Sequence, residues 1–387
     1  YAPAEFAGLS YPCSCGHTHR VDIKRIQIGS GCLASLPQAI TELGGGPVYM
    51  LADNNTWAAA GAQAAQLLEG AGIPFHARIL RAEKPLVPDE QALGAALADL
   101  EPEDRLVLAV GSGTINDICR FLSSRTGKPY LVACTAPSMD GYASTVCPLI
   151  LGGMKVTKPG VYPAAIIADT SIMKDAPMDM LTAGFGDIIG KYTALADWRL
   201  AQVRNGEYYC EECAGLMAHA VEKCAQNAAG LRARDGQAVQ YVTEALVLAG
   251  VAMGMVGNSR PASGAEHHFS HYWEVDALRW GQGHPLHGNS VGVGAVLSAS
   301  LYELAQSRLP AGFPLPDKGR ILACLAAAGS PTGPRELGIR WDLFQESVLH
   351  AMEIRDRFTI LRFLEGEGLL AACAVELARR FYPDGKE

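Results

Sequence analysis

The order of secondary-structure signals along the chain constrains the fold more than any other feature. Up to about residue 172, short apolar runs typical of buried strands alternate with amphipathic segments typical of helices. Such alternation predicts a mostly parallel sheet with helices on both faces. The clearest strand candidates are PVYMLAD, RLVLAV, YLVAC and AAIIAD. The sequence therefore predicts an α/β domain over residues 1–172.

Beyond about residue 172 the strand signals stop, and only helical patterns broken by Gly, Pro and Asn follow. We predict an all-α domain over residues 173–387. A chain of 387 residues is long enough for two domains of ordinary size. The expected helices are 177–197, 208–230, 237–255, 263–274, 287–307, 317–329 and, in pieces, 344–380.

Charge and apolar content exclude several classes of partner. The formal net charge of −8 argues against a nucleic-acid surface. The sequence shows neither an uninterrupted apolar run of membrane-spanning length nor a signal peptide, so we expect a cytoplasmic protein without a membrane partner. Eleven cysteines, an odd number scattered through apolar segments, predict reduced thiols and no disulfide.

Five of the ten histidines lie in GAEHHFSHYWEVDALRWGQGHPLHG, residues 264–288. His267 and His271 are four residues apart and share one face of a helix, which is a common way to present imidazoles to a divalent metal. His284 and His287 lie on a Gly-Pro turn that can direct an imidazole back toward that helix. A single buried histidine is more often structural, but five together favour a metal site, and we leave His268 and His284 as structural.

A third metal ligand must come from elsewhere, and Asp187 in AGFGDIIGKYTALADW is the best candidate. We expect Asp187 to follow a helix break at Gly-Phe-Gly and to open a long amphipathic helix. The alternative is that its carboxylate only caps that helix.

The turn VGSGTINDI, residues 110–118, follows a predicted strand and opens a predicted helix. Backbone N–H groups and the helix dipole can hold a pyrophosphate there, although the glycines do not match the G-x-G-x-x-G fingerprint. Asp53 ends the strand PVYMLAD, where it can accept hydrogen bonds from a ribose or, equally well, cap the next helix.

The loop CTAPSMDGYAST, residues 134–145, follows the next predicted strand and so falls at the same carboxyl edge of the sheet. Its polar side chains suit contacts to a cofactor and a polyol-like substrate; they are Thr135, Ser138, Asp140 and Ser144.

Near the N-terminus, Cys13, Cys15, His17 and His19 alternate in CSCGHTH. We expect this alternation to place the donors on opposite faces of an extended chain, and the spacing is not that of a zinc finger or ribbon. This favours a loop or edge segment without a metal, with a second metal site as the alternative.

Six segments together resemble the sn-glycerol-1-phosphate dehydrogenase family. They are DNNTW, GSGTINDI, TAPSMDGYAS, AGFGDIIGKYTALADW, GAEHHFSHYWE and GHPLHG, and the resemblance covers about residues 22–375. The family lies within the group of glycerol dehydrogenases, iron-containing alcohol dehydrogenases and dehydroquinate synthases, and this chain looks closest to its bacterial AraM-like branch. The resemblance implies an α/β Rossmann-like N-terminal domain plus an all-α C-terminal domain.

The resemblance also implies an activity, which is the NAD(P)H-linked interconversion of dihydroxyacetone phosphate and sn-glycerol 1-phosphate. It implies NAD(H) or NADP(H), one divalent metal (zinc first, with nickel or iron as alternatives), a small phosphate ester substrate and a homodimer or larger homo-oligomer. The implied metal ligands are Asp187, His267 and His287, and the implied substrate contacts are Asp140, Asp187 and His271. The implied nucleotide contacts are Asp53, Gly111, Ser112, Gly113, Thr114, Ile115, Thr135, Ala136, Pro137, Ser138 and Ser144.

Three alternative functions stay open at this point. A sugar-phosphate cyclase of the dehydroquinate synthase type is similar in layout, but normally has Glu at the position of Asp187. An oxidoreductase for an unphosphorylated alcohol and a non-catalytic nucleotide- or metal-binding regulator are the others. The residue that binds the phosphate is also open, with Lys155, Lys158, Lys191, Arg355 and Arg357 as candidates.

Overall fold

The computed structural model describes residues 1–81 and 85–385, which form two compact units. The first unit comprises residues 1–177 and 234–255, and the second comprises residues 178–233 and those from 256 onward. The chain therefore passes between the units three times. The boundary expected near residue 172 stays a prediction.

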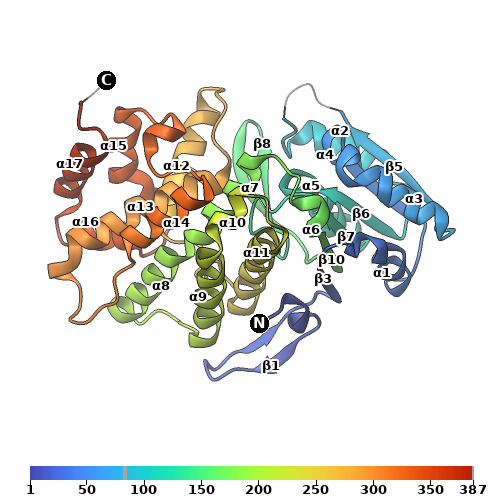
Figure 1. Ribbon diagram of the computed structural model, residues 1–387, viewed down its shortest axis with the longest axis horizontal. Helices are drawn as coiled ribbons and strands as arrows, with labels where there is room; N and C mark the ends of the chain where they lie inside the picture. The colour runs from blue at the N-terminus through green and yellow to red at the C-terminus, as the bar shows by residue number, and fades with distance from the viewer. Residues whose placement is uncertain (82–84, 386–387) are drawn as a thin grey trace. The chain divides into compact units, whose positions relative to one another are not determined.

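The first unit contains a six-stranded sheet in which every pairing is parallel (Figure 1). This confirms the predicted parallel sheet. In spatial order the strands are β3 (Arg25–Gly29), β10 (Ala165–Asp169), β7 (Tyr130–Cys134), β6 (Leu106–Gly111), β4 (Val48–Asp53) and β5 (Phe75–Leu80).

Helices cover both faces of this sheet, as predicted. Met50 of β4 packs in one core with Leu36 and Ala64, which belong to two helices on one face. The neighbouring Tyr49 points the other way, and its hydroxyl donates to the carbonyl of Ala96 at 2.7 Å. The helices of the unit are α1 (Leu36–Glu42), α2 (Asn54–Thr56), α3 (Ala62–Gly70), α4 (Glu90–Ala98), α5 (Gly113–Thr126), α6 (Thr170–Met173) and α11 (Gly236–Val256), with short helices η1 (Pro3–Phe6), η2 (Cys32–Ser35) and η3 (Trp57–Gly61).

Two antiparallel hairpins lie outside the sheet, namely β1 (Ser10–Pro12) with β2 (Thr18–Arg20), and β8 (Val146–Leu151) with β9 (Met154–Pro159). The second hairpin was not predicted, because its outer strand is mostly exposed and lacks an apolar run. The first hairpin contradicts our expectation that the alternating donors would separate. Residues two apart on a strand share a face, and the turn brings Cys15 to 3.5 Å from His19.

Helix α11 returns the chain to the first unit. By length and composition it is the one described helix apolar enough to cross a membrane, but 72% of its most apolar stretch is buried, as is also typical of a core helix. It packs too closely for side chains at two positions, since a Cβ at Gly254 would lie 1.5 Å from the Tyr162 hydroxyl and one at Gly250 would lie 2.7 Å from the Ala143 carbonyl oxygen.

The second unit is helical throughout its described residues. Its helices are α7 (Met178–Ile189), α8 (Lys191–Asn205), α9 (Glu211–Gln226), α10 (Ala228–Arg232), α12 (Ala265–Arg279), α13 (His287–Ala305), α14 (Lys318–Ala328), α15 (Trp341–His350), α16 (Ile360–Gly366) and α17 (Leu370–Phe381), with η4 (Gln306–Arg308), η5 (Pro334–Leu337) and η6 (Ala351–Ile354). A single apolar core joins α12 and α13 to α15–α17.

Helix α13 is the centre of this unit, since it is buried from Gly288 to Tyr302 and packs against both α7 and α12. Glycines allow the closest approach. A Cβ at Gly288 would lie 1.8 Å from the Ala183 carbonyl oxygen, and one at Gly186 would lie 2.3 Å from that of Gly288.

The expected helix break at Gly-Phe-Gly is therefore wrong. Helix α7 runs through Gly184 and Gly186, and Asp187 lies near its C-terminal end rather than at a helix start. The alternative that Asp187 serves as an N-terminal cap is wrong for the same reason. These glycines provide close packing between helices instead of interrupting one.

Candidate functional site

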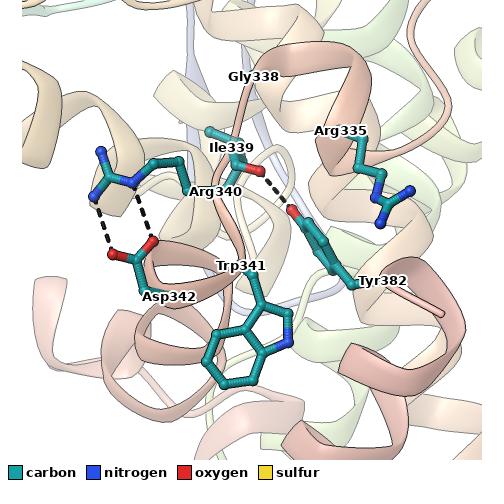
Figure 2. Close-up of a pocket in the computed structure, with 7 residues that line it drawn as sticks. All are labelled: Arg335, Gly338, Ile339, Arg340, Trp341, Asp342 and Tyr382. Atoms are coloured by element: carbon teal, nitrogen blue, oxygen red, sulfur yellow. Dashed lines mark hydrogen bonds and ion pairs between the residues drawn. The ribbon is translucent and has the colours of Figure 1, made fainter. Parts of the chain in front are cut away.

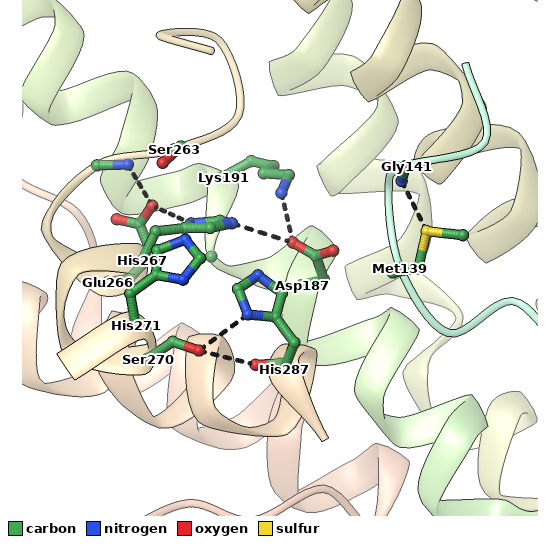
Figure 3. Close-up of polar contacts among 12 residues, drawn as sticks. Met139, Gly141, Asp187, Lys191, Ser263, Glu266, His267, Ser270, His271 and His287 are labelled. Carbon is green, nitrogen blue, oxygen red and sulfur yellow. Dashed lines mark hydrogen bonds and ion pairs between the residues drawn. The ribbon is translucent and has the colours of Figure 1, made fainter. Parts of the chain in front are cut away.

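Three helices of the second unit bring four predicted site residues together (Figure 3). His267 and His271 share one face of α12, as predicted, with ring centres 6.2 Å apart. His287 is the first residue of α13, and its ring centre lies 5.2 Å from that of His267 and 5.1 Å from that of His271. Asp187 comes from α7, and its Oδ1 lies 3.6 Å from Nε2 of His267.

This arrangement suits a divalent metal. Asp187, His267 and His287 each offer a ligand atom, and these atoms all lie within 4.8 Å of one another. One carboxylate and two imidazoles are donors that zinc and other divalent transition metals accept, with a coordination position left for a substrate. A second donor set, His271, Glu274 and His287, meets the same distance limit and shares His287 with the first.

His267 is oriented by Glu266, a residue that our sequence reasoning missed. Nδ1 of His267 lies 2.9 Å from Oε1 of Glu266, while Oε2 of Glu266 accepts from the Thr193 hydroxyl at 2.7 Å. A carboxylate that accepts from Nδ1 leaves the lone pair on Nε2, the atom that faces Asp187. Burial, reinforced by the charge of Lys191, lowers the pKa of His267 well below its usual value, so the imidazole is neutral and able to bind a metal.

Glu274, also missed, orients the other two imidazoles. Its Oε1 lies 3.0 Å from Nδ1 of His287 and its Oε2 lies 3.3 Å from Nδ1 of His271. Ser270 adds a contact of 3.1 Å to the same nitrogen of His287. The sequence signal was present, because Glu266 precedes His267 directly and Glu274 follows His271 by one helical turn.

Two cations border the cluster. Nζ of Lys191 lies 2.6 Å from Oδ1 of Asp187, and both side chains are completely buried. Arg355 donates to Nε2 of His271 at 3.3 Å. The positive charge of Lys191 compensates the buried carboxylate, and the energetic value of such a pair depends on keeping both partners.

The two remaining histidines of the segment lie outside both donor sets. His268 is completely buried, and neither ring nitrogen has a hydrogen-bond partner among the residues that the structure describes. Burial, followed by the charges of Arg357 and Arg355, lowers its pKa to about 3. His284 is exposed, with Nδ1 2.9 Å from the carbonyl of Pro285.

In the first unit, the predicted nucleotide contacts follow three adjacent strands. Asp53 ends β4, Gly111 ends β6, and Thr135 follows β7, so all three lie at the carboxyl edge of the sheet. The amide of Thr135 donates to the Gly111 carbonyl at 3.2 Å. A Cβ at Gly111 would lie 2.6 Å from the Cβ of Ile115, so this glycine is needed for the strand to turn directly into α5.

Asp53 caps the helix that follows it. Its Oδ1 accepts from the amides of Asn55 and Thr56, both at 2.8 Å, which confirms the capping alternative. Neither bond uses Oδ2, so a ribose contact through that oxygen stays a prediction.

Arg120, which sequence reasoning missed, holds the loop that carries Asp140. Its guanidinium pairs with Asp117 at 2.8 Å and donates to the carbonyls of Tyr142 and Val146, both at 3.1 Å. Burial raises the pKa of Asp117 to about 7, against the lowering by Arg120. Along this loop Thr135, Ala136 and Pro137 are buried, whereas Ser138, Asp140 and Ser144 are half-buried.

A surface pocket in the second unit contains none of these residues (Figure 2). It lies beside Arg340 and Trp341, and the Tyr382 hydroxyl donates to the Ile339 carbonyl at 2.6 Å. Arg340 and Asp342 at its border pair at 3.1 Å. With no cluster of donors comparable to the histidines, this pocket is not the predicted site.

Known proteins with the same arrangement of elements indicate the fold class. A model of the iron-containing alcohol dehydrogenase family matches residues 27–177. An iron-containing alcohol dehydrogenase structure from Thermococcus thioreducens superposes with a TM-score of 0.71 at 16% identity, covering 93% of this chain and 99% of that one. The parallel sheet and the helical unit thus have the fold of iron-containing alcohol dehydrogenases, which confirms the predicted fold.

Two relatives narrow the assignment. A glycerol-1-phosphate dehydrogenase (NAD(P)+) of Halalkalibacterium halodurans is 36% identical, with 90% of this chain and 94% of the relative covered. One of the same name from Bacillus velezensis is 37% identical, with 91% and 93% covered. The chain belongs to the glycerol-1-phosphate dehydrogenase (NAD(P)+) family, which confirms the resemblance found in its sequence.

Proposed function

We propose that this protein interconverts dihydroxyacetone phosphate and sn-glycerol 1-phosphate, with NADH or NADPH as the hydride donor. The observation that carries the proposal is the Asp187, His267 and His287 cluster, whose ligand atoms lie within 4.8 Å of one another, in a chain related to dehydrogenases of that name. Reduction adds a hydride to carbon 2 of the ketone and a proton to its oxygen.

We assign the metal to Asp187, His267 and His287, with zinc first and nickel or iron as alternatives. A divalent ion held there would supply Lewis-acid chemistry, which would polarise the substrate carbonyl and stabilise negative charge on its oxygen. Glu266 and Glu274 accept from the Nδ1 atoms of His267 and His287 and thereby hold both rings with Nε2 available.

His271 is our candidate for the residue that holds a substrate hydroxyl or relays the proton. Its Nδ1 faces Glu274 and its Nε2 faces Arg355, so the ring is oriented at both nitrogens. Asp140, on the loop held by Arg120, and Asp187 are the other proposed substrate contacts.

For the substrate phosphate we propose Arg355, because contacts in the second unit argue against the other candidates there. Lys191 is paired with Asp187 in the interior. Arg357 donates to the Ser263 carbonyl at 2.6 Å and to the Ser259 hydroxyl at 2.8 Å, so its guanidinium stabilises the loop before α12. Arg355 donates to Nε2 of His271, which is a proposed substrate contact, and a guanidinium can bind a phosphate through two parallel hydrogen bonds.

We place the nucleotide at the carboxyl edge formed by β4, β6 and β7, with its phosphates at the start of α5. Asp53 at this edge disfavours a 2′-phosphate, so we expect a preference for NADH. We also propose a homodimer or larger assembly and a cytoplasmic location.

The test is NADH and NADPH oxidation by chelator-stripped protein with Zn²⁺, Ni²⁺ or Fe²⁺ restored singly. We expect turnover with dihydroxyacetone phosphate, none with unphosphorylated dihydroxyacetone, and a product that an sn-glycerol 3-phosphate-specific enzyme does not oxidise. Turnover of the unphosphorylated ketone would identify a general alcohol dehydrogenase instead. No turnover of either ketone while nucleotide and metal still bind would refute the proposal and lead to cyclase substrates.

Arg355→Met tests the phosphate assignment in the same assay. We expect KM for dihydroxyacetone phosphate to rise by 10-fold or more, because a charge-assisted hydrogen bond of about 1.5–3 kcal/mol is lost. Arg362 is half-buried and pairs with Glu365 at 3.1 Å, and it provides the control variant Arg362→Met. An unchanged KM in Arg355→Met would exclude this residue as the phosphate ligand.

A further inference from the structure

The N-terminal β1–β2 hairpin gathers metal-binding side chains that the dehydrogenase reaction does not use. The amide of Cys13 donates to the His17 carbonyl at 2.9 Å, and the amide of Gly16 donates to the Cys13 carbonyl at 3.0 Å. Gly16 has φ of +88°, a conformation that favours glycine. This turn folds Cys13 and Cys15 back onto the strand that carries His19.

The resulting distances fit a zinc ion. The Sγ of Cys15 lies 3.5 Å from Nε2 of His19, and the ligand atoms of Cys13, Cys15 and His19 all lie within 4.8 Å of one another. In a tetrahedral site with Zn–S of about 2.3 Å and Zn–N of about 2.0–2.1 Å, a sulfur and a nitrogen ligand are separated by about 3.6 Å. His17 is exposed and is not part of this set.

His19 is held as metal-binding histidines usually are. Its ring is 1% exposed, and Nδ1 lies 2.7 Å from the carbonyl oxygen of Met255 in the same unit. A carbonyl only accepts, so Nδ1 carries the hydrogen and the lone pair of Nε2 points toward Cys15. A histidine whose other nitrogen donates to a backbone carbonyl is the arrangement that fixes tautomer and ring orientation around zinc.

We propose that Cys13, Cys15 and His19 bind a structural Zn²⁺, which is separate from the catalytic metal and contributes no step to the reaction. An isolated two-stranded hairpin is at best marginally stable, and these strands have three residues each. The ion fastens the hairpin, and the His19–Met255 contact connects it to α11. Two thiolates and one imidazole select zinc, so the protein holds two metals per chain in sites of different chemistry.

The first test is the metal content of the intact purified protein. We expect two metals per chain in the wild type and in Ser14→Ala, a control in the same turn. We expect one in Cys13→Ser/Cys15→Ser and one in His267→Gln. The His267 variant removes only the catalytic ion, so it shows the hairpin zinc separately. The metal count does not depend on turnover, and this test therefore stands even if the proposed dehydrogenase activity is not found.

Spectroscopy identifies the ligands. In cobalt-substituted protein we expect sulfur-to-cobalt charge-transfer absorption that His267→Gln retains and Cys13→Ser/Cys15→Ser loses. If the double variant does not fold, the thiols of the wild-type protein can be titrated with a mercurial reagent instead. We expect this titration to release one zinc per chain, which a chromogenic chelator detects. Absence of the charge-transfer band, or modification of both thiols without zinc release, would overturn the proposal.

Discussion

Replacing Gly288 with alanine should separate α7 from α13 and disrupt the proposed metal site. A Cβ at this position would lie 1.8 Å from the carbonyl oxygen of Ala183 and 2.6 Å from its carbonyl carbon. Real Cβ contacts essentially never fall below 3.0 Å, so the helices must move apart by about 1.2 Å even to reach that limit. Because the obstructing atoms are backbone, no change of side-chain rotamer relieves the overlap.

The same displacement of the two helices determines how much stability and metal affinity the variant loses. Overpacking usually costs about 1–3 kcal/mol, and a clash between two backbones lies at the upper end of that range or above it. Metal–ligand distances must hold to about 0.2 Å, so a movement of about 1.2 Å takes Asp187 or His287 out of reach. We expect metal affinity to fall more than about 100-fold, which is the upper end for losses outside the ligand shell.

Calorimetric titration of chelator-stripped protein with Zn²⁺ or Ni²⁺ measures the affinity, and urea unfolding measures the stability. Gly215→Ala is the matched control, because Gly215 is also helical but has nothing within 4 Å of its would-be Cβ. That variant should bind metal normally and gain about 0.5–1 kcal/mol from helix propensity. Wild-type metal affinity in Gly288→Ala would refute the inference that this contact sets the ligand geometry.

Three further changes test residues in the site and next to it. Glu274→Gln should weaken metal binding about 10–100-fold in a chelator-competition assay, whereas Glu353→Gln at a surface His–Glu pair should not; equal losses would contradict the orienting role. Lys191→Met should destabilise metal-free protein toward urea by about 3–5 kcal/mol, because it removes the cation that compensates the buried Asp187 carboxylate. An unchanged midpoint would show that the pair is dispensable. The pKa of His268 is lowered to about 3 in the folded protein, so between about pH 6 and 3 only the unfolded chain protonates this residue. The free energy of unfolding should therefore decrease by up to about 1.4 kcal/mol for each unit by which the pH is lowered through this range. His268→Gln should reduce this dependence of stability on pH. An identical dependence in the variant would refute the assignment of the effect to His268.

The sequence predicted the features that depend on local periodicity. Alternating strand and helix signals were sufficient for the parallel sheet, and the four-residue spacing of His267 and His271 placed both on one face of α12. The order of the loops also indicated which segments follow adjacent strands, since a parallel sheet collects the loops that follow its strands at one edge.

Features that depend on contacts between distant segments could not be predicted. Gly186 was interpreted as a helix break because its partner, Gly288, lies 102 positions away in the sequence and only the packed structure shows their approach. The contact between Glu274 and His287 is another such case, because the two residues lie on different helices, α12 and α13. Arg120 could not be assigned to the loop it holds, because an arginine in a helix is normally solvated.

The path of the chain has a consequence for how the protein folds during synthesis. Helix α11 belongs to the first unit but leaves the ribosome only after residues 178–233 of the second unit. The places where Gly250 and Gly254 contact the unit, at Ala143 and Tyr162, therefore stay uncovered while those residues are made. Domains normally fold as units in the order of their synthesis. Here the N-terminal unit can complete its core only when translation has passed residue 255, so ribosome-bound chains stalled before that point should be sensitive to proteases.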